Sequence, residues 1–196
     1  NEVIANLAAG YIREEEERRG GDGTAGLDNY ALVHPNDHVN LCQSTNCAYP
    51  SAAKLAVVIK HGATGRALRD VIAALRAKGD AFSGVVKMGR TQLQDAVPMT
   101  LGQEFHAFAS SLDADATFMA RNVDQLYELN VGGTAIGTKI CADPRFSAEA
   151  VAALAELTGL PLRSPTDFVE ASSSTGAFLL FSNILRRVAV KTSKMC

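Results

Sequence analysis

The chain has 196 residues, of which 47% are hydrophobic and 20% are charged, so it has enough apolar side chains for a sizeable core and is not expected to be disordered. Its formal charge is −2, and no segment combines clustered Lys and Arg with aromatic residues, which argues against nucleic acid as the main partner. The sequence has no apolar run long enough for a membrane span and no signal-peptide pattern at its start. We therefore expect a soluble, cytoplasmic protein with no membrane partner.

Helix-forming residues dominate the composition. The chain contains 31 alanines and no Trp, and Ala is the best helix former, so we predict an all-α fold. The first residues, from Asn1, already follow a helical pattern without an initiating Met, and the chain closes at Cys196 without the Gly or Pro that usually ends a helix. We interpret the sequence as an internal fragment of a longer protein.

The predicted elements are long helices separated by polar loops. The first helix ends in a run of Arg and Glu that is typical of a solvated helix face, and Gly62 and Gly65 leave open whether the second helix is continuous or broken in two. We predict helices over 4–19, 51–75, 99–126 and 147–157 and from about Ser174 onward, with Ser172 to Thr175 at the start of the last one, and loops over 20–50, 87–95 and 132–138.

Three motifs that suggest a nucleotide or a metal have a simpler interpretation. The glycines of 21–26 match a dinucleotide-binding pattern, but they follow an acidic helix instead of a strand. His34 and His38 are four residues apart, but Pro35 between them argues against a regular helix that presents both to a metal. Cys42 and Cys47 lack a second pair at zinc spacing. We therefore predict no cofactor and no metal.

Neutral hydrogen-bonding residues recur in the loops. Ser44, Thr45 and Asn46 precede one long helix, Thr91 and Gln92 precede another, and 132–138 is rich in Gly and Thr. Taken singly, each cluster is explained by capping or turn formation. Together they supply donors near helix N-termini, which is a way to hold a small carboxylate without a basic patch.

Four segments closely resemble the aspartase and fumarase family: His34 to Asn40, Gln43 to Asn46, Lys87 to Pro98 and Gly133 to Thr138. The likeness extends from Asn1 to Cys196. It implies an incomplete long-helix bundle, in which 1–43 is the C-terminal part of the first domain and 44–196 is the first part of the central helical domain. It also implies a homotetramer in which three subunits build each active site.

Within that family, Thr91-Gln92 resembles the members that eliminate ammonia from L-aspartate to give fumarate, because fumarases of this class usually have Thr-His there. Glutamine donates and accepts hydrogen bonds but cannot shuttle a proton at neutral pH, so its expected duty is positioning. Fumarate hydratase remains an alternative, and a non-catalytic helical oligomerisation module is a second one. Argininosuccinate and adenylosuccinate cleavage fit the motifs less well.

The resemblance also implies roles for individual residues. Ser44, Thr45 and Asn46 are expected to bind substrate carboxylate or amino groups, and Thr91 and Gln92 to hold the other end. A possible secondary carboxylate site comprises His34, Asn36 and Asp37. The family's general base is a serine on a flexible loop that does not occur in these 196 residues, so no catalytic residue is assigned and the chain alone is expected to be inactive.

Two positions depart from the family pattern. Cys47 follows Ser-Thr-Asn where the family has Asp, and Lys139 follows Gly-Thr-Ala-Ile-Gly-Thr where the family has Gly. We expect Cys47 to be unable to replace the carboxylate as an acceptor, and Lys139 to add bulk and charge beside a glycine-rich turn. Both changes are expected to disturb local geometry or activity.

Overall fold

The computed structural model describes residues 1–196, and helices make up most of it. The predicted all-α class is confirmed, with one small two-stranded sheet added. The chain forms two compact units: the first comprises 1–51 and 129–173, and the second comprises 52–128 and 174–196. No helix is both long enough and apolar enough to cross a bilayer.

The first unit consists of short elements and loops around the start of one long helix. Its α1 packs against α2 and η1 through a face of small residues, on which Ala5 and Ala9 are fully buried. Small side chains allow this close approach of backbones. The elements are α1 (Glu2–Arg18), α2 (Asn29–Leu32), the π-helix η1 (Pro35–Val39), the first turns of α3 (Thr45–Ala81), α5 (Phe146–Thr158) and α6 (Phe168–Ser173).

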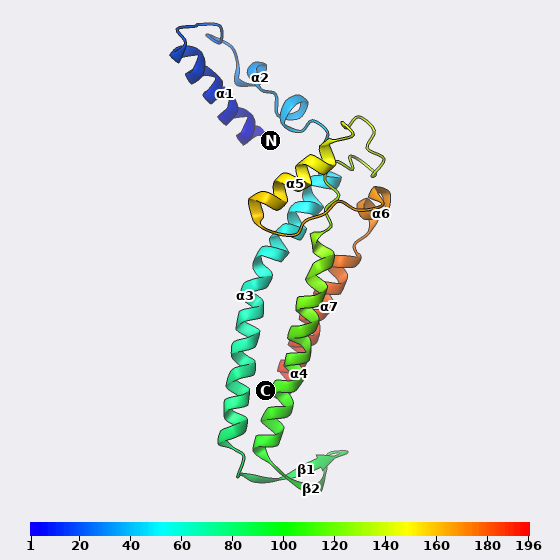
Figure 1. Cartoon of the computed structure of the whole chain (residues 1–196). Coiled ribbons are helices and arrows are strands. Elements are labelled where there is room, and N and C mark those ends of the chain that lie inside the picture. The colour runs from blue at the N-terminus through cyan, green and yellow to red at the C-terminus, as the bar shows by residue number, and fades with distance from the viewer. The chain divides into compact units, whose positions relative to one another are not determined.

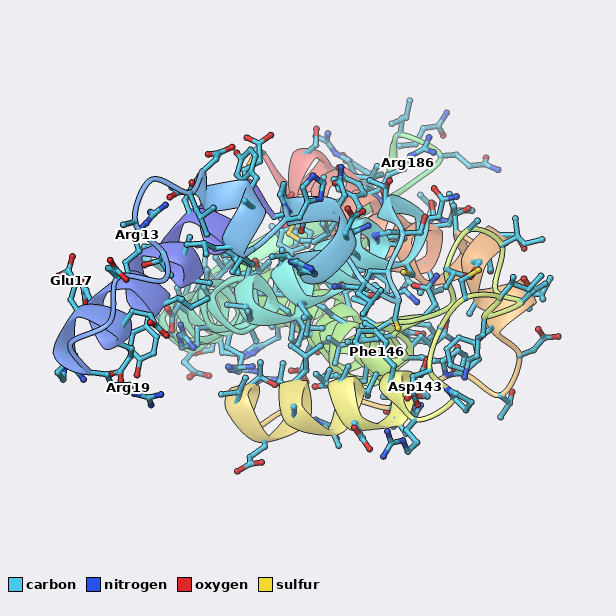
Figure 2. All side chains as sticks on the ribbon, turned by 90° about the horizontal axis from the view of Figure 1, so that it is seen from above. Arg13, Glu17, Arg19, Asp143, Phe146 and Arg186 are labelled. Carbon is cyan, nitrogen blue, oxygen red and sulfur yellow. The ribbon has the colours of Figure 1, made fainter.

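The charged end of α1 is mostly a solvated face, as predicted, but one side chain holds a loop. Arg13 (labelled in Figure 2) donates to the Leu27 carbonyl at 2.6 Å and to the Asn29 side chain. Glu15 pairs with Arg18 and lies 3.9 Å from Arg19, both on the exposed side of the helix. Arg13 therefore ties α1 to the segment that leads into α2.

The second unit is a set of long antiparallel helices with a hairpin at one end. The rest of α3, α4 (Leu101–Asn122) and α7 (Gly176–Met195) lie side by side in Figure 1. The antiparallel strands β1 (Val86–Thr91) and β2 (Gln94–Thr100) connect α3 to α4. A short 3-10 helix, η2 (Val123–Tyr127), continues α4. A capping box starts α4, because the Thr100 hydroxyl accepts the Gln103 N–H and the Gln103 side chain accepts the Thr100 N–H.

A buried charge cluster joins α4 to α7. Leu112 and Met119 fill the apolar side of α4, and between them Asp115 is fully buried. Its carboxylate lies 2.6 Å from Arg187 and 2.8 Å from Lys191, both on α7, and Lys191 also donates to the Ser111 carbonyl at 3.0 Å. A buried carboxylate is tolerated only with such partners.

Several element boundaries differ from the prediction. The helix predicted from Ser51 begins at Thr45, and Gly62 and Gly65 do not interrupt it. The predicted loop over 87–95 forms most of the hairpin. The last helix, α7, begins at Gly176. Ser172 and Ser173, which were predicted at its start, are instead the last residues of α6. The helices predicted over 4–19 and 147–157 agree closely with α1 and α5, and 132–138 is confirmed as a loop.

Candidate functional site

The start of α3 is closed by a sulfur-containing cap. Ser44 lies directly before the helix, and its hydroxyl accepts the Asn46 N–H at 3.2 Å. Three positions on, the buried Cys47 accepts the Ser44 N–H at its Sγ, and its thiol donates to the Ser44 carbonyl, both at 3.2 Å. The Cys47 sulfur thus makes the bond that Glu or Gln makes to the N-cap N–H in a capping box, while the Ser44 hydroxyl bonds Asn46 instead of Cys47. The expectation that Cys47 cannot act as the acceptor is therefore wrong.

Pro50 lies inside the first turns of α3, which therefore begins earlier than the predicted Ser51. Pro50 has no N–H, so the carbonyl of Asn46 loses its usual partner four residues on. The side-chain amide of Asn130 donates to that carbonyl at 3.2 Å. The helix tolerates the proline because a side chain distant in sequence replaces the missing backbone hydrogen bond.

The glycine-rich loop over 132–138 lies against the start of α3. The Asn46 side-chain amide donates to the Ala135 carbonyl at 2.8 Å. Gly137 has φ of +88°, and a Cβ there would meet the Phe168 carbonyl oxygen at 2.2 Å, so only glycine fits. The loop is therefore held by α3 on one side and packed against α6 on the other.

Lys139 occupies a glycine-like backbone conformation. Its φ is +59°, in the region that an L-residue adopts only at a cost, and its Nζ lies 3.6 Å from the centre of the Phe168 ring. The expected bulk and charge are present, but the cation lies over an aromatic face, where it is attracted. Lys139 thus combines a strained backbone with a stabilising side-chain contact.

An open pocket of about 670 Å³ lies in the first unit, at the N-terminus of α3. It brings together Ser44 and Thr45 with Asn36 and Asp37 of the possible secondary site, and with Thr134 of the third loop. The remaining lining residues are Asn40, Leu41, Cys42, Gln43, Ala135, Ile140 and Cys141. The lining contains one carboxylate and no Lys or Arg, so an anion held here depends on hydroxyls, amides and the helix N-terminus.

His34 and His38 serve the local backbone. His34 caps η1, because its Nδ1 accepts the N–H groups of Asn36 at 3.3 Å and Asp37 at 3.2 Å. His38 Nδ1 accepts the N–H of His34 at 2.8 Å. Of the possible secondary site, Asn36 and Asp37 line the pocket, whereas His34 shapes the turn that presents them.

The segment before α5 is tied to Cys42, which lines the pocket. Cys42 Sγ accepts the Asp143 N–H at 3.3 Å, which ties two distant parts of the chain together. The Asp143 carboxylate accepts the Arg145 guanidinium and the Arg145 N–H, and these bonds lower its pKa below the usual range. Figure 2 labels Asp143 beside Phe146, the first residue of α5.

Thr91 and Gln92 belong to the second unit, so the pocket does not contain them. They lie at the hairpin tip, where β1 ends at Thr91 and β2 begins at Gln94. Gln92 and Leu93 have φ of +49° and +63°, the pattern of a two-residue type I′ turn. Both predicted side chains are exposed, and neither makes a side-chain hydrogen bond within the chain.

Buried polar residues that no sequence motif indicated connect the segments around the pocket. Asn130 is 1% exposed, accepts from the Ser51 hydroxyl at 3.3 Å and donates to the Ser172 hydroxyl at 3.2 Å, in addition to the Asn46 carbonyl. Pro50 shows only that a carbonyl of the first turns of α3 needs another donor, and it does not indicate which residue supplies that donor.

Comparisons with known proteins agree with these features. A family model described as "Lyase" matches residues 1–196. The chain is 50% identical to the aspartate ammonia-lyase of Pseudomonas canavaninivorans over 197 residues and 45% identical to that of Helicobacter pylori over 199 residues. All of the chain is covered in both, but it spans only 39% and 40% of the length of these relatives.

Solved structures give the same grouping. The structure is similar to a fumarate lyase:delta crystallin from Brucella melitensis bound to cobalt, with a TM-score of 0.85, 47% identity, and coverage of 100% of this chain and 40% of that one. It is also similar to a class II fumarase from Schistosoma mansoni, with a TM-score of 0.75, 32% identity, and coverage of 81% and 36%. With a family match along its whole length and these relatives, the chain belongs to the lyase family of the aspartases and fumarases.

Proposed function

We propose that this chain is the part of an aspartate ammonia-lyase that binds substrate carboxylates, in a parent enzyme that eliminates ammonia from L-aspartate to give fumarate. The observation that carries the proposal is the pocket at the N-terminus of α3, with Ser44, Thr45 and Thr134 in its lining. Relatives named aspartate ammonia-lyase at 41–50% identity support the choice of reaction. The parent is proposed to be a cytoplasmic homotetramer.

The residues suit the charge that this reaction develops. A base removes a proton from the carbon next to one carboxylate, and the resulting enediolate carries two negative charges before ammonia leaves. The Ser44 and Thr45 hydroxyls are donors for that charge, and they lie at the positive end of the α3 dipole. Loss of one donor that tightens on the developing charge costs about 3 to 4 kcal/mol of barrier, by analogy with oxyanion holes.

Asn46 does not line the pocket, and it is proposed to bind the substrate amino group. Its amide is used by the Ala135 carbonyl, so its side-chain oxygen is the group available to accept a hydrogen bond from a substrate amino group. Thr91 and Gln92 are proposed to hold the other end of the substrate in the assembled enzyme, and His34, Asn36 and Asp37 to form a secondary carboxylate site. The domain boundary between 43 and 44 also stays a prediction.

The test uses the complete reading frame of the parent protein. Purified enzyme is assayed for fumarate by its ultraviolet absorbance, with L-aspartate and L-malate as parallel substrates. Turnover of aspartate without malate supports the proposal. Turnover of malate alone supports fumarate hydratase, the alternative favoured by the likeness to a class II fumarase. Absence of both reactions supports a non-catalytic oligomerisation module.

Shared active sites are tested by mixing inactive variants. A Ser44→Ala/Thr45→Ala enzyme and a Gln92→Ala enzyme are each expected to be nearly inactive. If different subunits supply these residues to one site, tetramers reassembled from both variants regain a fraction of the activity. No recovery in mixed tetramers, verified by mass, contradicts the shared site. The 196-residue chain alone is expected to release no fumarate.

A further inference from the structure

Asn130 is a buried polar side chain of the first unit that makes three hydrogen bonds. It lies just before the glycine-rich loop, is 1% exposed, and contacts three segments. Its Nδ2 donates to the Asn46 carbonyl and to the Ser172 hydroxyl, both at 3.2 Å, and its Oδ1 accepts from the Ser51 hydroxyl at 3.3 Å. These bonds fix which end of the amide is oxygen and which is nitrogen, because donors and acceptors match only one way.

The hydrogen bond from Asn130 to the Asn46 carbonyl replaces a backbone hydrogen bond of α3. Pro50 removes the N–H that the Asn46 carbonyl needs, and Asn130 supplies the replacement. Asn46 in turn holds the loop through Ala135 at 2.8 Å. A shift of the first turn of α3 therefore moves two walls of the pocket together: the one made by Ser44 and Thr45, and the one made by Thr134 and Ala135.

We propose that Asn130 is a positioning residue of the carboxylate pocket: its side-chain amide, acting on the Asn46 carbonyl that Pro50 leaves free, sets the geometry of Ser44 to Asn46 and of the loop over 132–138. Asn130 is absent from the pocket lining, so it acts through these residues and not on a ligand. The proposal rests on the proposed function for the pocket's role in the parent enzyme, but its geometric part is tested separately.

Cys47 is a built-in reporter of this geometry. It is fully buried in the first turn of α3, and its thiol is bonded to Ser44. Opening of that turn exposes the thiol to N-ethylmaleimide, and the labelling rate follows the population of the open state when closing is fast. Mass spectrometry with peptide fragmentation distinguishes Cys47 from Cys42.

The experiment compares four forms of the chain: unchanged, Asn130→Ala, Pro50→Ala, and the double variant. Asn130→Ala removes three hydrogen bonds and is expected to raise the Cys47 labelling rate about tenfold or more, because loss of the bond to the Asn46 carbonyl alone accounts for about that factor. In the double variant, the N–H of alanine at position 50 can donate to the Asn46 carbonyl, so most of the protection is expected to return. A residue that merely fills space is not rescued in this way.

Val151→Ala is the matched control, because Val151 is 3% exposed in α5 of the same unit and makes no bond to the pocket. Each variant is also unfolded in urea, so that local opening is separated from global loss of stability. The proposal is overturned if Val151→Ala at similar stability raises Cys47 labelling as much as Asn130→Ala does, or if Pro50→Ala fails to restore protection. Amide exchange of residues 45–49 gives the same comparison without a thiol reagent.

A final measurement separates this proposal from the proposed function. In the assembled parent enzyme, Asn130→Ala is expected to raise KM for L-aspartate and to lower kcat, and Pro50→Ala is expected to restore both in part. If the parent enzyme acts on neither L-aspartate nor L-malate, the proposed function fails, while the labelling result still decides whether Asn130 positions the pocket.

Discussion

Cys47 and Ser44 close the first turn of α3 through sulfur: the Ser44 N–H donates to Cys47 Sγ, and the thiol donates back to the Ser44 carbonyl. A carboxylate at this position makes a stronger bond to the same N–H, because charge-assisted hydrogen bonds are about twice as strong as neutral ones. It also interacts favourably with the N-terminal end of the helix dipole.

That carboxylate would, however, be fully buried with this N–H as its partner and would lose the thiol's bond to the Ser44 carbonyl. We therefore predict that Cys47→Asp lowers the free energy of unfolding by about 1 to 3 kcal/mol at pH 7, and that the loss shrinks as the new carboxylate is protonated at acid pH. Urea unfolding at pH 7 and pH 4 measures both values. Cys47→Asn is the control, since it supplies an acceptor without charge. A loss with Asn equal to that with Asp contradicts the role of the charge.

At position 139 we expect glycine to give a more stable protein than alanine, the reverse of the usual order. With φ of +59°, an alanine keeps the backbone cost and loses the contact with Phe168, whereas a glycine loses the contact but removes the cost. We predict that Lys139→Gly is more stable than Lys139→Ala by about 1 kcal/mol. Thermal or urea unfolding of the two variants tests this, and an alanine variant at least as stable as the glycine one contradicts it.

Asp115 is expected to be the most sensitive charged residue of the second unit. Its side chain is 1% exposed and pairs with Arg187 and Lys191. Removing one member of a buried pair costs about 3 to 5 kcal/mol, but Arg187 is 49% exposed and can regain water, so we predict about 2 to 3 kcal/mol for Asp115→Asn.

The control for Asp115 lies two residues away on the same helix. Asp113 pairs with Arg76 at 3.1 Å, with both side chains about half exposed. Such a surface pair contributes at most about 1 kcal/mol, so Asp113→Asn is expected to change the urea midpoint little. Equal effects of the two variants contradict the importance of burial.

The lowered pKa of His61 makes the stability of the second unit depend on pH. Burial against Phe181, and then the positive charge of Arg69, lower the pKa of His61 below its ordinary value. Its Nδ1 is buried without a partner, so the neutral form is favoured in the folded state. The unfolded chain then binds the proton more readily, and the stability that the neutral form provides is lost as pH falls below about 6.5.

We therefore predict that His61→Gln shows a smaller loss of stability between pH 7.5 and pH 5.5 than the unchanged chain. The measurement is a urea midpoint at each pH at constant ionic strength. If both chains lose the same stability over this range, proton uptake by His61 is not the cause.

The helices and the pocket were predictable to different degrees. Amphipathic periodicity indicated α1, α4, α5 and α7, since their apolar stripes repeat at helical spacing. The hairpin was missed because its tip, Gln92-Leu93, lacks the Asn-Gly or Asp-Gly signature of a type I′ turn, and because β1 contains Lys, Gly and Arg. The start of α3 was missed because Pro50 normally marks a boundary.

Local motifs identified Ser44 and Thr45, but the partners that assemble the pocket come from distant parts of the chain. Asn130 and Ser172 have no sequence signature, because their role depends on which segments the fold brings together. Cys47 and Lys139 showed the converse: departures from a family pattern that look disruptive in sequence occupy positions where sulfur and an aromatic ring compensate for them.

The backbone conformation of the hairpin tip lowers the stability of the fold at a position proposed to bind substrate. Gln92 and Leu93 both adopt left-handed backbone conformations that Asn and Gly adopt far more easily, at a penalty of about 1 to 2 kcal/mol for each residue. An Asn-Gly tip is therefore expected to make a more stable hairpin, but it would remove the side chain of Gln92. Selection for thermal stability and selection for substrate recognition oppose each other at this turn, and a stabilised version of this protein should be expected to lose activity here first.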